Sequence, residues 1–281
     1  MSGTLYVVAT PIGNLEDVTL RALRVLREVS LVAAEDTRRT ARLLQHYSIS
    51  ARTTSLHEHN ERSKTPGLIA RLIAGESIAL VSDAGTPVVS DPGSHLVAAA
   101  HEAGIRVEPV PGPNAALALL SASGLQGTGF VFAGFPPNRS KARLEWLRNL
   151  ANEPKLLIFY EAPHRIHRTL EDLLAVFGDR SLAIGRELTK VHESLAVRPI
   201  SAHLAHLDVS RGEFTLVLEG RARAKPSRSK PAARQLAAEF GELTNNGAVG
   251  RREAIRELAR NYEISAREVF ALLEEAKKSA E

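Results

Sequence analysis

The chain has 281 residues, 44% of them hydrophobic and 24% charged, with a formal net charge of +4 and no cysteine. This length allows two or three domains with buried cores, and the composition is typical of a soluble globular protein. The lack of cysteine excludes disulfides, thiolate zinc sites and cysteine nucleophiles. No apolar run reaches the roughly 18 residues of a membrane helix, and the N-terminal MSGTLYVVATPIG does not resemble a secretory signal. We therefore expect a cytoplasmic protein with no membrane partner.

Short apolar strands alternate with amphipathic helices in the first part of the chain. The predicted strands cover residues 4–10, 31–34, 77–82 and 106–110. A helix is predicted from Leu20 to Val29, with Thr19 as its N-cap. Asp91 is predicted to be only the N-cap of a further helix, with Pro92 as its first residue and an end at Gly104. This alternation favours a parallel sheet covered by helices.

The second half contains a further α/β series and a helical end. Its predicted strands cover residues 129–135, 156–160, 182–185 and 214–218, and their close succession indicates a mixed sheet. Residues 221–234 have the composition of a basic linker. Two helices are predicted after it, 252–260 and 266–277, resembling a helix-turn-helix, with Ser265 and Glu268 as a capping box. The expected domains are 1–116, 117–222 and 223–281.

Four loops of the first half are candidates for a ligand site. The sequence contains no P-loop, no G-x-G-x-x-G after its first strand and no H-E-x-x-H. Instead TPIGN, EDTRRT, SDAGTP and PGPN follow strands and combine glycine or proline with small polar residues. Ligands of open α/β sheets bind at the carboxyl ends of the strands, where such loops bring backbone groups close. One loop of this kind is more often a tight turn, but four at one edge predict a pocket.

The order of these motifs resembles a known family. SDAGTPVVSDPG, preceded by TPIGNLEDVTLRAL and AEDTRRTARLL and followed by PVPGPNAALALLSASGL, is similar to the tetrapyrrole-methylase superfamily of S-adenosylmethionine-dependent methyltransferases. Within it, the sequence resembles the 2′-O-ribose methyltransferases that modify a decoding-centre cytidine of 16S rRNA. The resemblance continues through FAGFPPNRSKAR, IFYEAPHRI, GRELTKVHE and GEFTLVLEG, over roughly residues 4–220. It implies two α/β domains with S-adenosyl-L-methionine in the cleft between them, a homodimer, and the small ribosomal subunit or its 16S rRNA as partner.

The resemblance also implies which residues meet the cofactor. Asp83 or the adjacent backbone would bind the ammonium group, while Gly85 and Thr86 would let the chain approach closely. Tyr160 and Leu188 would close over the adenosine. The full expected set is Pro11, Asp83, Ala84, Gly85, Thr86, Asn114, Ala115, Ala116, Tyr160 and Leu188.

Methyl transfer to a ribose hydroxyl needs help from the protein, because the hydroxyl is a weak acid and a poor nucleophile. Asp36 and Glu161 are the preferred candidates for a base, and Lys190 is the candidate cation that would lower the pKa of the hydroxyl. An ion pair across the domain cleft is an equally good interpretation of each. His57 and His59 would face one side of an extended segment, but without a third ligand they predict surface residues, so no metal is expected.

Basic residues on loops predict contacts with RNA phosphates, which give affinity without reading bases. The candidates are Arg38, Arg39, Arg139, Lys141, Arg165 and Arg186, and Arg143 belongs to the same loop. A solvated charged face explains any one cluster equally well. Aromatic residues make up only 5% of the chain, which argues against an extended base-stacking platform and favours recognition of an assembled subunit.

Two alternatives differ in the acceptor or in the chemistry. An enzyme of the same fold would methylate a tetrapyrrole or cobalamin precursor, or a protein. A non-catalytic ribosome-assembly protein would bind RNA alone. The intact SDAGTP and PGPN loops favour retention of the cofactor.

Overall fold

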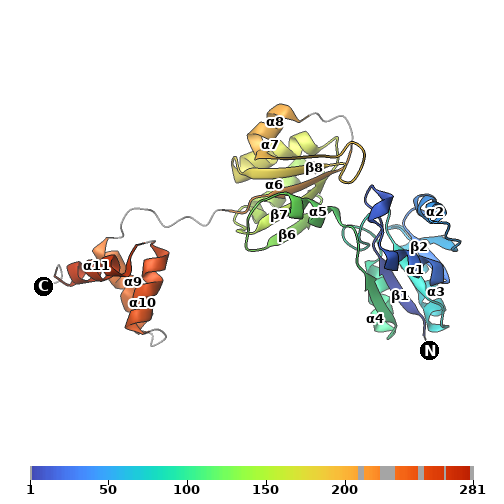
Figure 1. The fold of residues 1–281 in the computed structure, drawn as a ribbon, viewed down its shortest axis with the longest axis horizontal. Helices are drawn as coiled ribbons and strands as arrows, with labels where there is room; N and C mark the ends of the chain where they lie inside the picture. Colours follow the sequence, from blue (N-terminus) through green and yellow to red (C-terminus); the bar gives the residue numbers. More distant parts are fainter. Residues whose placement is uncertain (1, 208–211, 222–231, 246–249, 263, 279–281) are drawn as a thin grey trace. The chain divides into compact units, whose positions relative to one another are not determined.

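The structure, a computed structural model, describes residues 2–207, 212–221, 232–245, 250–262 and 264–278. It divides into two compact units, Met1–Arg221 and Ala222–Glu281 (Figure 1). Among the described residues, the first unit contains two five-stranded sheets and the second contains three helices. Most of the linker predicted at 221–234 lies outside the described residues.

The first sheet is parallel throughout, with the strand order β3-β2-β4-β1-β5. Its strands are β1 (Thr4–Val8), β2 (Leu31–Ala34), β3 (Thr53–Ser55), β4 (Ile78–Val81) and β5 (Arg106–Val110). Every residue of β2 and β4 is buried, as expected of strands between two helix layers. The predicted parallel sheet is therefore confirmed. The short strand β3, whose sequence TTS has no apolar residue, was not predicted.

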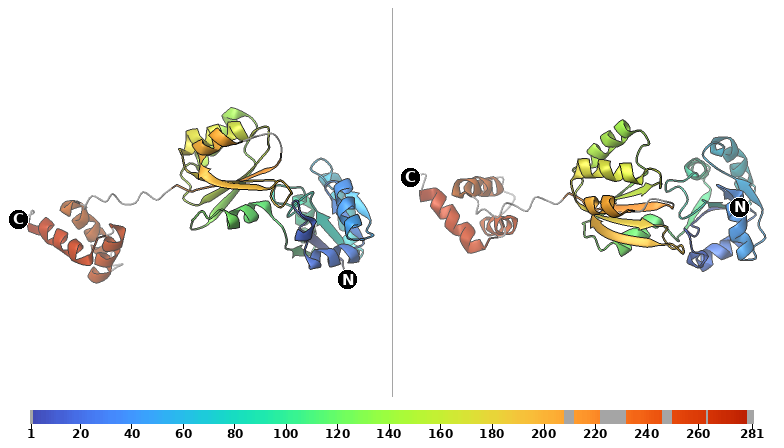
Figure 2. Two further views of the ribbon diagram at one scale, coloured as in Figure 1. Left: turned by 45° about the horizontal axis from the view of Figure 1, so that its top comes forward. Right: turned by 90° about the horizontal axis from the view of Figure 1, so that it is seen from above.

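Helices cover both faces of the first sheet (Figure 2). They are α1 (Leu20–Glu28), α2 (Thr37–His46), α3 (Glu61–Ile73) and α4 (Ser94–Glu102), with a short 3₁₀ helix η1 (Leu15–Asp17) before α1. Side chains of α1 and α2 form one buried cluster with the sheet, and those of α3 and α4 form the other. Thr19 caps α1 as predicted, since its side chain accepts a hydrogen bond from the N–H of Ala22 at 3.1 Å.

The predicted start of α4 is wrong, and the reason is a long-range contact. The helix begins at Ser94, and Asp91 lies before it. The carboxylate of Glu61 accepts hydrogen bonds from the N–H groups of His95 at 2.7 Å and Leu96 at 3.2 Å. Glu61, which is buried, thus accepts hydrogen bonds from free N–H groups at the start of α4. The carboxyl of Asp91 does not cap this helix.

The second sheet is mixed, with the order β6-β7-β10-β8-β9. Its strands are β6 (Phe130–Gly134), β7 (Leu156–Glu161), β8 (Ser181–Arg186), β9 (Ser194–Pro199) and β10 (Phe214–Leu218). Only the β6–β7 pair is parallel among these neighbours. The edge strand β9, which is mostly exposed, was not predicted.

One face of the second sheet carries a single helix and the other face carries three (Figure 2). These helices are α5 (Ala115–Ala122) on the first face and α6 (Ser140–Leu150), α7 (Ile166–Phe177) and α8 (Ile200–His206) on the second. Ala116 and Leu119 of α5 are packed against this sheet. The domain boundary predicted after residue 116 therefore falls inside a helix that belongs with the second sheet.

The second unit is a helical module with its own core. Its helices are α9 (Ala233–Asn245), α10 (Arg251–Asn261) and α11 (Ala266–Lys278), of which α9 was not predicted. Leu236, Leu258 and Val269 are buried together. The predicted capping box is present, since the N–H of Ser265 donates to the Glu268 carboxylate at 2.9 Å and the N–H of Glu268 donates to Ser265 Oγ at 3.2 Å. None of the helices described is long and apolar enough to cross a membrane.

A buried ion pair joins two helices of the second sheet. Arg143 of α6 is only 4% exposed, and its Nε donates to the carboxylate of Asp172 in α7 at 2.7 Å. Its Nη1 donates to the carbonyl oxygen of Asn138 at 3.2 Å. From the sequence, Arg143 was predicted to lie among the RNA-facing basic residues. Its burial corrects that interpretation.

We expect Arg143→Ala to lower the free energy of unfolding by about 3 kcal/mol, because it leaves the Asp172 carboxylate in a largely buried position without its cation. Urea unfolding followed by circular dichroism measures the change. Lys141→Ala, an exposed position on the same helix, is the matched control and should stay within about 0.5 kcal/mol of the wild type. A loss in Arg143→Ala no larger than in this control would contradict the structural role.

Candidate functional site

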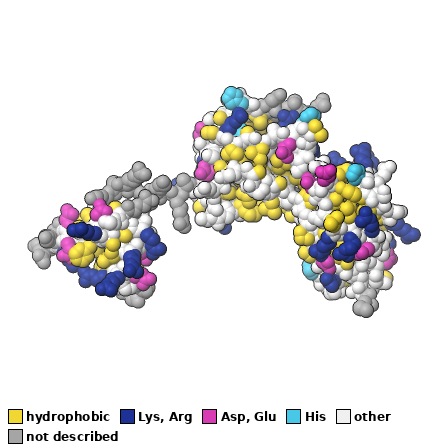
Figure 3. All heavy atoms as spheres, viewed as in Figure 1, with side chains coloured by type: hydrophobic (Ala, Val, Ile, Leu, Met, Phe, Trp, Pro, Cys, Tyr) yellow, Lys and Arg dark blue, Asp and Glu magenta, His cyan; other side chains and the backbone are white. Residues whose placement is uncertain are grey.

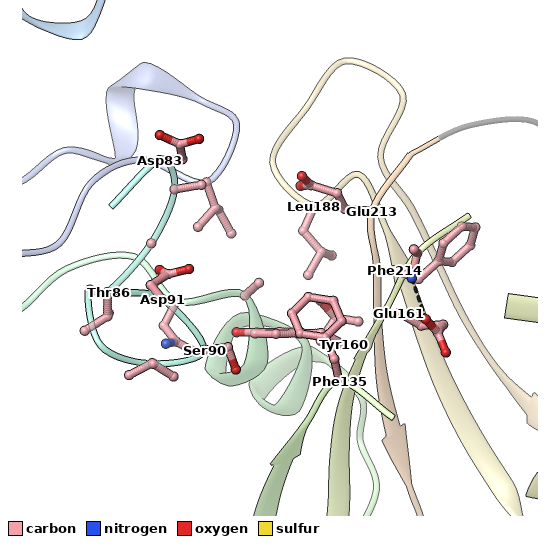
Figure 4. Close-up of a pocket in the computed structure, with 18 of the residues that line it drawn as sticks. Asp83, Thr86, Ser90, Asp91, Phe135, Tyr160, Glu161, Leu188, Glu213 and Phe214 are labelled. Carbon is pink, nitrogen blue, oxygen red and sulfur yellow. Dashed lines mark hydrogen bonds between the residues drawn. The ribbon is translucent and has the colours of Figure 1, made fainter. Parts of the chain in front are cut away.

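The strand-end loops of the two sheets enclose a pocket of about 420 Å³ (Figure 4). Sites for small molecules and cofactors usually have about 300–1,000 Å³. The SDAGTPVVSD segment after β4 forms one wall, and the ends of β7 and β10 with the loop after β8 form the opposite wall. In Figure 4, Asp83, Thr86 and Asp91 lie across the pocket from Tyr160 and Leu188.

Most of the residues predicted to meet a cofactor line this pocket. Those that do are Asp83, Ala84, Gly85, Thr86, Asn114, Ala115, Tyr160 and Leu188. Ala116 lies behind the pocket, buried, and its N–H donates to Tyr160 Oη at 3.3 Å. Pro11 lines a smaller adjacent pocket of about 140 Å³, together with Arg39 and Arg42.

Backbone contacts join the first-half loops into one wall. The N–H of Thr10 donates to the carbonyl oxygen of Gly85 at 2.8 Å, and the N–H of Gly85 donates back at 3.0 Å. Gly85 has φ +83°, a conformation that glycine adopts without strain. The Thr86 hydroxyl donates to the carbonyl oxygen of Pro113 at 3.2 Å. The TPIGN, SDAGTP and PGPN loops are thereby fixed relative to one another.

The loop after β8 touches the first-half wall directly. The N–H of Asn14 donates to Thr189 Oγ1 at 2.9 Å. A Cβ atom on Gly13 would lie 2.4 Å from Lys190 Cγ, so a residue without a side chain is needed for this approach. Glu187 and Thr189 have φ values of +49° and +67°, which non-glycine residues rarely adopt. The strained loop holds Leu188, the residue between them, in the pocket.

The pocket interior is rich in carboxyl groups, and two of them lie beside each other. Asp83 accepts a hydrogen bond from the N–H of Asp36 at 2.9 Å, and its other oxygen lies 3.5 Å from the guanidinium of Arg39. The Glu35 carboxylate accepts one from the N–H of Asp83 at 3.3 Å. Burial raises the pKa of Glu35, and the charge of Asp83 adds to this rise.

Asp91 lies at the site although its sequence pattern predicted only a helix cap. Its carboxyl lines the pocket, and burial raises its pKa to about 6, although a hydrogen bond with the Ser82 side chain opposes the rise. The charges of Glu35 and Asp83 raise it further. Within the described residues, no lysine or arginine forms an ion pair with it. The repeat of Ser-Asp at Ser82-Asp83 and Ser90-Asp91 was the available signal, but it was interpreted as a cap.

Glu161 lines the pocket, but its carboxylate is occupied by protein partners. The side chain is fully buried and lies 2.8 Å from the guanidinium of Arg165. It also accepts hydrogen bonds from the hydroxyl of Thr169 at 2.5 Å and from the N–H of Ala162 at 2.7 Å. Both oxygens of the carboxylate are in contact with these donors, so the geometry favours an anchor over a proton acceptor.

The structure does not bring Asp36 into the pocket. Asp36 is the N-cap of α2, where its carboxylate accepts from the N–H of Arg38 at 2.8 Å and pairs with the same residue's guanidinium at 2.8 Å. These hydrogen bonds hold the pKa of Asp36 well below its usual range. A carboxylate with so low a pKa is a weak base at neutral pH, so the position gives no support to the catalytic role predicted for it.

Lys190 does line the pocket. Its Nζ donates to the carboxylates of Glu187 at 2.9 Å and Glu213 at 3.2 Å. Burial lowers the pKa of Lys190, but these two carboxylates outweigh that effect and raise it. The ammonium group therefore stays charged at neutral pH, at the edge of the acidic interior.

The basic residues predicted to contact RNA fall into two groups. Arg38, Arg39, Arg139 and Lys141 are exposed. Arg165 is 16% exposed, and its guanidinium donates to Glu161, to the Pro136 carbonyl and to Asn138, which makes it a clamp within the protein. Arg186 is half-buried at the end of β8. The burial of Arg165 gives no support to an RNA contact by that residue.

A metal site was not expected. The described residues contain no group of three or more histidine and carboxylate side chains placed to hold an ion. The side-chain amide nitrogen of Asn60 donates a hydrogen bond to His57 Nε2 at 2.9 Å.

Comparisons with known proteins agree with this arrangement. Residues 4–203 match the family model of the tetrapyrrole (corrin/porphyrin) methylases. The ribosomal RNA small subunit methyltransferase I of Escherichia coli O157:H7 is 50% identical over 246 residues, which are 86% of each chain. The protein of the same name from Synechocystis is 45% identical over 274 residues, covering 96% of this chain and 97% of its own.

Solved structures share the fold. The methyltransferase CobJ superposes with a TM-score of 0.61 at 21% identity, over 79% of this chain and 95% of its own. A uroporphyrin-III C-methyltransferase from Thermus thermophilus gives a TM-score of 0.56 at 23% identity, over 76% and 94% of the two chains.

We expect the free energy of unfolding of the wild type to fall, relative to Asp91→Asn, as the pH rises from about 4 to 6. The folded chain holds the Asp91 proton up to a pH of about 6, whereas the unfolded chain releases it near the ordinary aspartate pKa of 3.8. Ionisation in this window therefore costs the folded state only. For a fully buried group, this pKa difference would change the free energy of unfolding by about 3 kcal/mol. We expect about half of that for Asp91, because part of its carboxyl reaches solvent.

Urea unfolding of both proteins between pH 4 and 7.5 measures this difference. A constant offset between the two stability curves would show that the Asp91 carboxyl ionises as easily in the folded chain as in the unfolded one, contrary to its burial.

Proposed function

The chain belongs to the tetrapyrrole (corrin/porphyrin) methylases, and we propose that it transfers a methyl group from S-adenosylmethionine to ribosomal RNA of the small subunit. The proposed acceptor is the ribose 2′-hydroxyl of a cytidine in the decoding centre of 16S rRNA. The single observation that best supports S-adenosylmethionine as the cofactor is the half-buried Asp91 carboxyl in a pocket built from strand-end loops. The names of the relatives from Escherichia coli and Synechocystis support the RNA acceptor.

The chemistry of the pocket fits this cofactor. S-adenosylmethionine carries an ammonium and a sulfonium charge, and it supplies an activated methyl group when bound. Asp91 and Asp83 would hold the ammonium, because a carboxyl that is costly to ionise in an empty site gains most from a cation. The apolar surfaces of Leu188 and Tyr160 would cover the adenosine. Ala115 and Gly85 would let the backbone approach.

On the acceptor side, Lys190 is the residue best placed to assist. As the acceptor oxygen gains the methyl group, the bond from that group to the sulfonium sulfur breaks and leaves a neutral thioether, and the hydroxyl proton would pass to water. A fixed positive charge beside the oxygen would stabilise the developing alkoxide. The pairs with Glu187 and Glu213 hold the Lys190 ammonium in one position. Alignment of the hydroxyl with the methyl group would lower the activation barrier further, because positioning alone can remove a large part of it.

An RNA acceptor accounts for the exposed cations. Arg38, Arg39, Arg139 and Lys141 would contact phosphates, which give affinity and salt dependence without reading sequence. Figure 3 shows lysine and arginine side chains at the surface of both units.

The proposal is tested by offering tritium-labelled S-adenosylmethionine with unmethylated small subunits, free 16S rRNA and a uroporphyrinogen in parallel. We expect label in the subunits, on the ribose of one cytidine after digestion to nucleosides. Label in the uroporphyrinogen alone would contradict the RNA acceptor and retain the cofactor. Absence of cofactor binding by calorimetry would contradict the whole proposal.

We expect Lys190→Gln to lower kcat by about 10- to 100-fold, because it removes a charge that acts on the transition state. Lys190→Arg, which keeps the charge, should recover part of the loss. Steady-state methyl transfer to small subunits measures kcat, and calorimetry should show an unchanged Kd for S-adenosylmethionine. An unaltered kcat in Lys190→Gln would rule out the electrostatic role.

A further inference from the structure

An exposed aromatic ring lies in the wall of the pocket, near its carboxyl groups. Phe135 directly follows β6, lines the pocket and is 54% exposed. Single exposed apolar residues are common on protein surfaces, but this ring opens into a pocket suited to a ligand, where a bound planar group would cover it. The functional site described above leaves this ring without a role.

Phe135 packs against another aromatic ring of the pocket. Its ring centroid lies 5.4 Å from that of Tyr160 at an interplanar angle of 56°. Tyr160 is itself fixed, by an edge contact with Phe132 at 5.1 Å and by the hydrogen bond from Ala116 to its hydroxyl. Figure 4 shows the Phe135 and Tyr160 side chains next to each other in the pocket. The remaining surface of the Phe135 ring is available to a planar partner.

The loop that carries Phe135 is held rigidly. Two prolines, Pro136 and Pro137, follow it and restrict the backbone. Arg165 donates to the Pro136 carbonyl oxygen at 2.5 Å, and Arg143 donates to that of Asn138 at 3.2 Å. Both arginines are themselves paired with buried or largely buried carboxylates. Such preorganisation lowers the entropy cost of placing the ring against a ligand.

The charged residues around Phe135 indicate which kind of ligand contacts its loop. The interior of the pocket contains Glu35, Asp83 and Asp91, which attract a cation and repel a phosphate. The loop, by contrast, continues into Arg139 and Lys141, which are exposed. An aromatic ring followed closely by cations is the combination that binds single-stranded nucleic acid, through stacking and phosphate contacts. When the ribose hydroxyl of a nucleotide enters the pocket, the base of the same nucleotide lies at the rim of the pocket.

We propose that Phe135 stacks on the base of the nucleotide whose ribose is methylated, while Arg139 and Lys141 bind the adjoining phosphates. This inference rests on the proposed function and adds a positioning residue for the acceptor. Stacking orients the ribose without reading the base, so the sequence preference comes from elsewhere. Glu161 then acts through Arg165, by holding the loop that presents the ring.

The test uses the full chain in four forms: wild type, Phe135→Ala, Phe135→Trp and the control Phe130→Ala. Phe130 begins the same strand β6, is 44% exposed and does not line the pocket. Each form is assayed for methyl transfer to unmethylated small subunits, and its Kd for S-adenosylmethionine is measured by calorimetry.

We expect Phe135→Ala to lower kcat/KM for the subunit by about 10- to 100-fold, the range of one lost base–aromatic stack, with the cofactor Kd unchanged. Phe135→Trp should keep most of the activity, and Phe130→Ala should match the wild type. Wild-type kcat/KM in Phe135→Ala would overturn the inference, as would a loss that appears in the cofactor Kd instead. Failure of the wild type to methylate RNA would count against the proposed function itself.

Discussion

The cost of burying negative charge is the constraint on which this site depends. A carboxylate removed from water without a cation is destabilised, and Asp91 is in this position among the described residues. Two neighbours in the same loop, Val88 and Ser90, have positive φ values of 72° and 66°, which adds backbone strain. The loop is thus less stable than a simple connection between β4 and α4 would be. The low polarity around Asp91 raises the free energy of its charged form, and it also strengthens the attraction of that charge to a cationic ligand. The folded chain is therefore less stable, but it binds a cation more tightly.

Glu161 shows the opposite use of a carboxylate in the same pocket. It has a largely buried arginine, a hydroxyl and a backbone N–H as partners, so its position is fixed. Two carboxyl groups in one pocket therefore take different roles because their partners differ. Asp91 remains available to a ligand, while Glu161 holds the loop that carries Phe135. The pocket then has an acidic interior suited to a cationic cofactor and an aromatic, cationic rim suited to RNA.

Local pattern predicted most of the fold but not the long-range contacts. The buried runs of β2, β4 and β10 and the helix of α1 follow from hydrophobic spacing, and the SDAGTP and PGPN motifs located one wall of the pocket. The cap of α4 could not be predicted, because Glu61 reaches it from another helix. The burial of Arg143 likewise depends on a carboxylate in a different helix. Sequence identifies a charged residue, but only the tertiary structure shows whether it faces solvent, a partner or a ligand.

If the Asp91 carboxyl pairs with the charge of the cofactor, binding of the cofactor should release protons. S-adenosylmethionine is titrated calorimetrically at pH 6 in buffers of different ionisation enthalpy, with the wild type and with Asp91→Asn. A cation lowers the pKa of the carboxyl, so the wild type should release about half a proton per cofactor bound. Asp91→Asn should release none and bind more weakly. Equal proton release by the two proteins, or equal affinity for S-adenosylmethionine, would show that the Asp91 carboxyl does not pair with the cofactor.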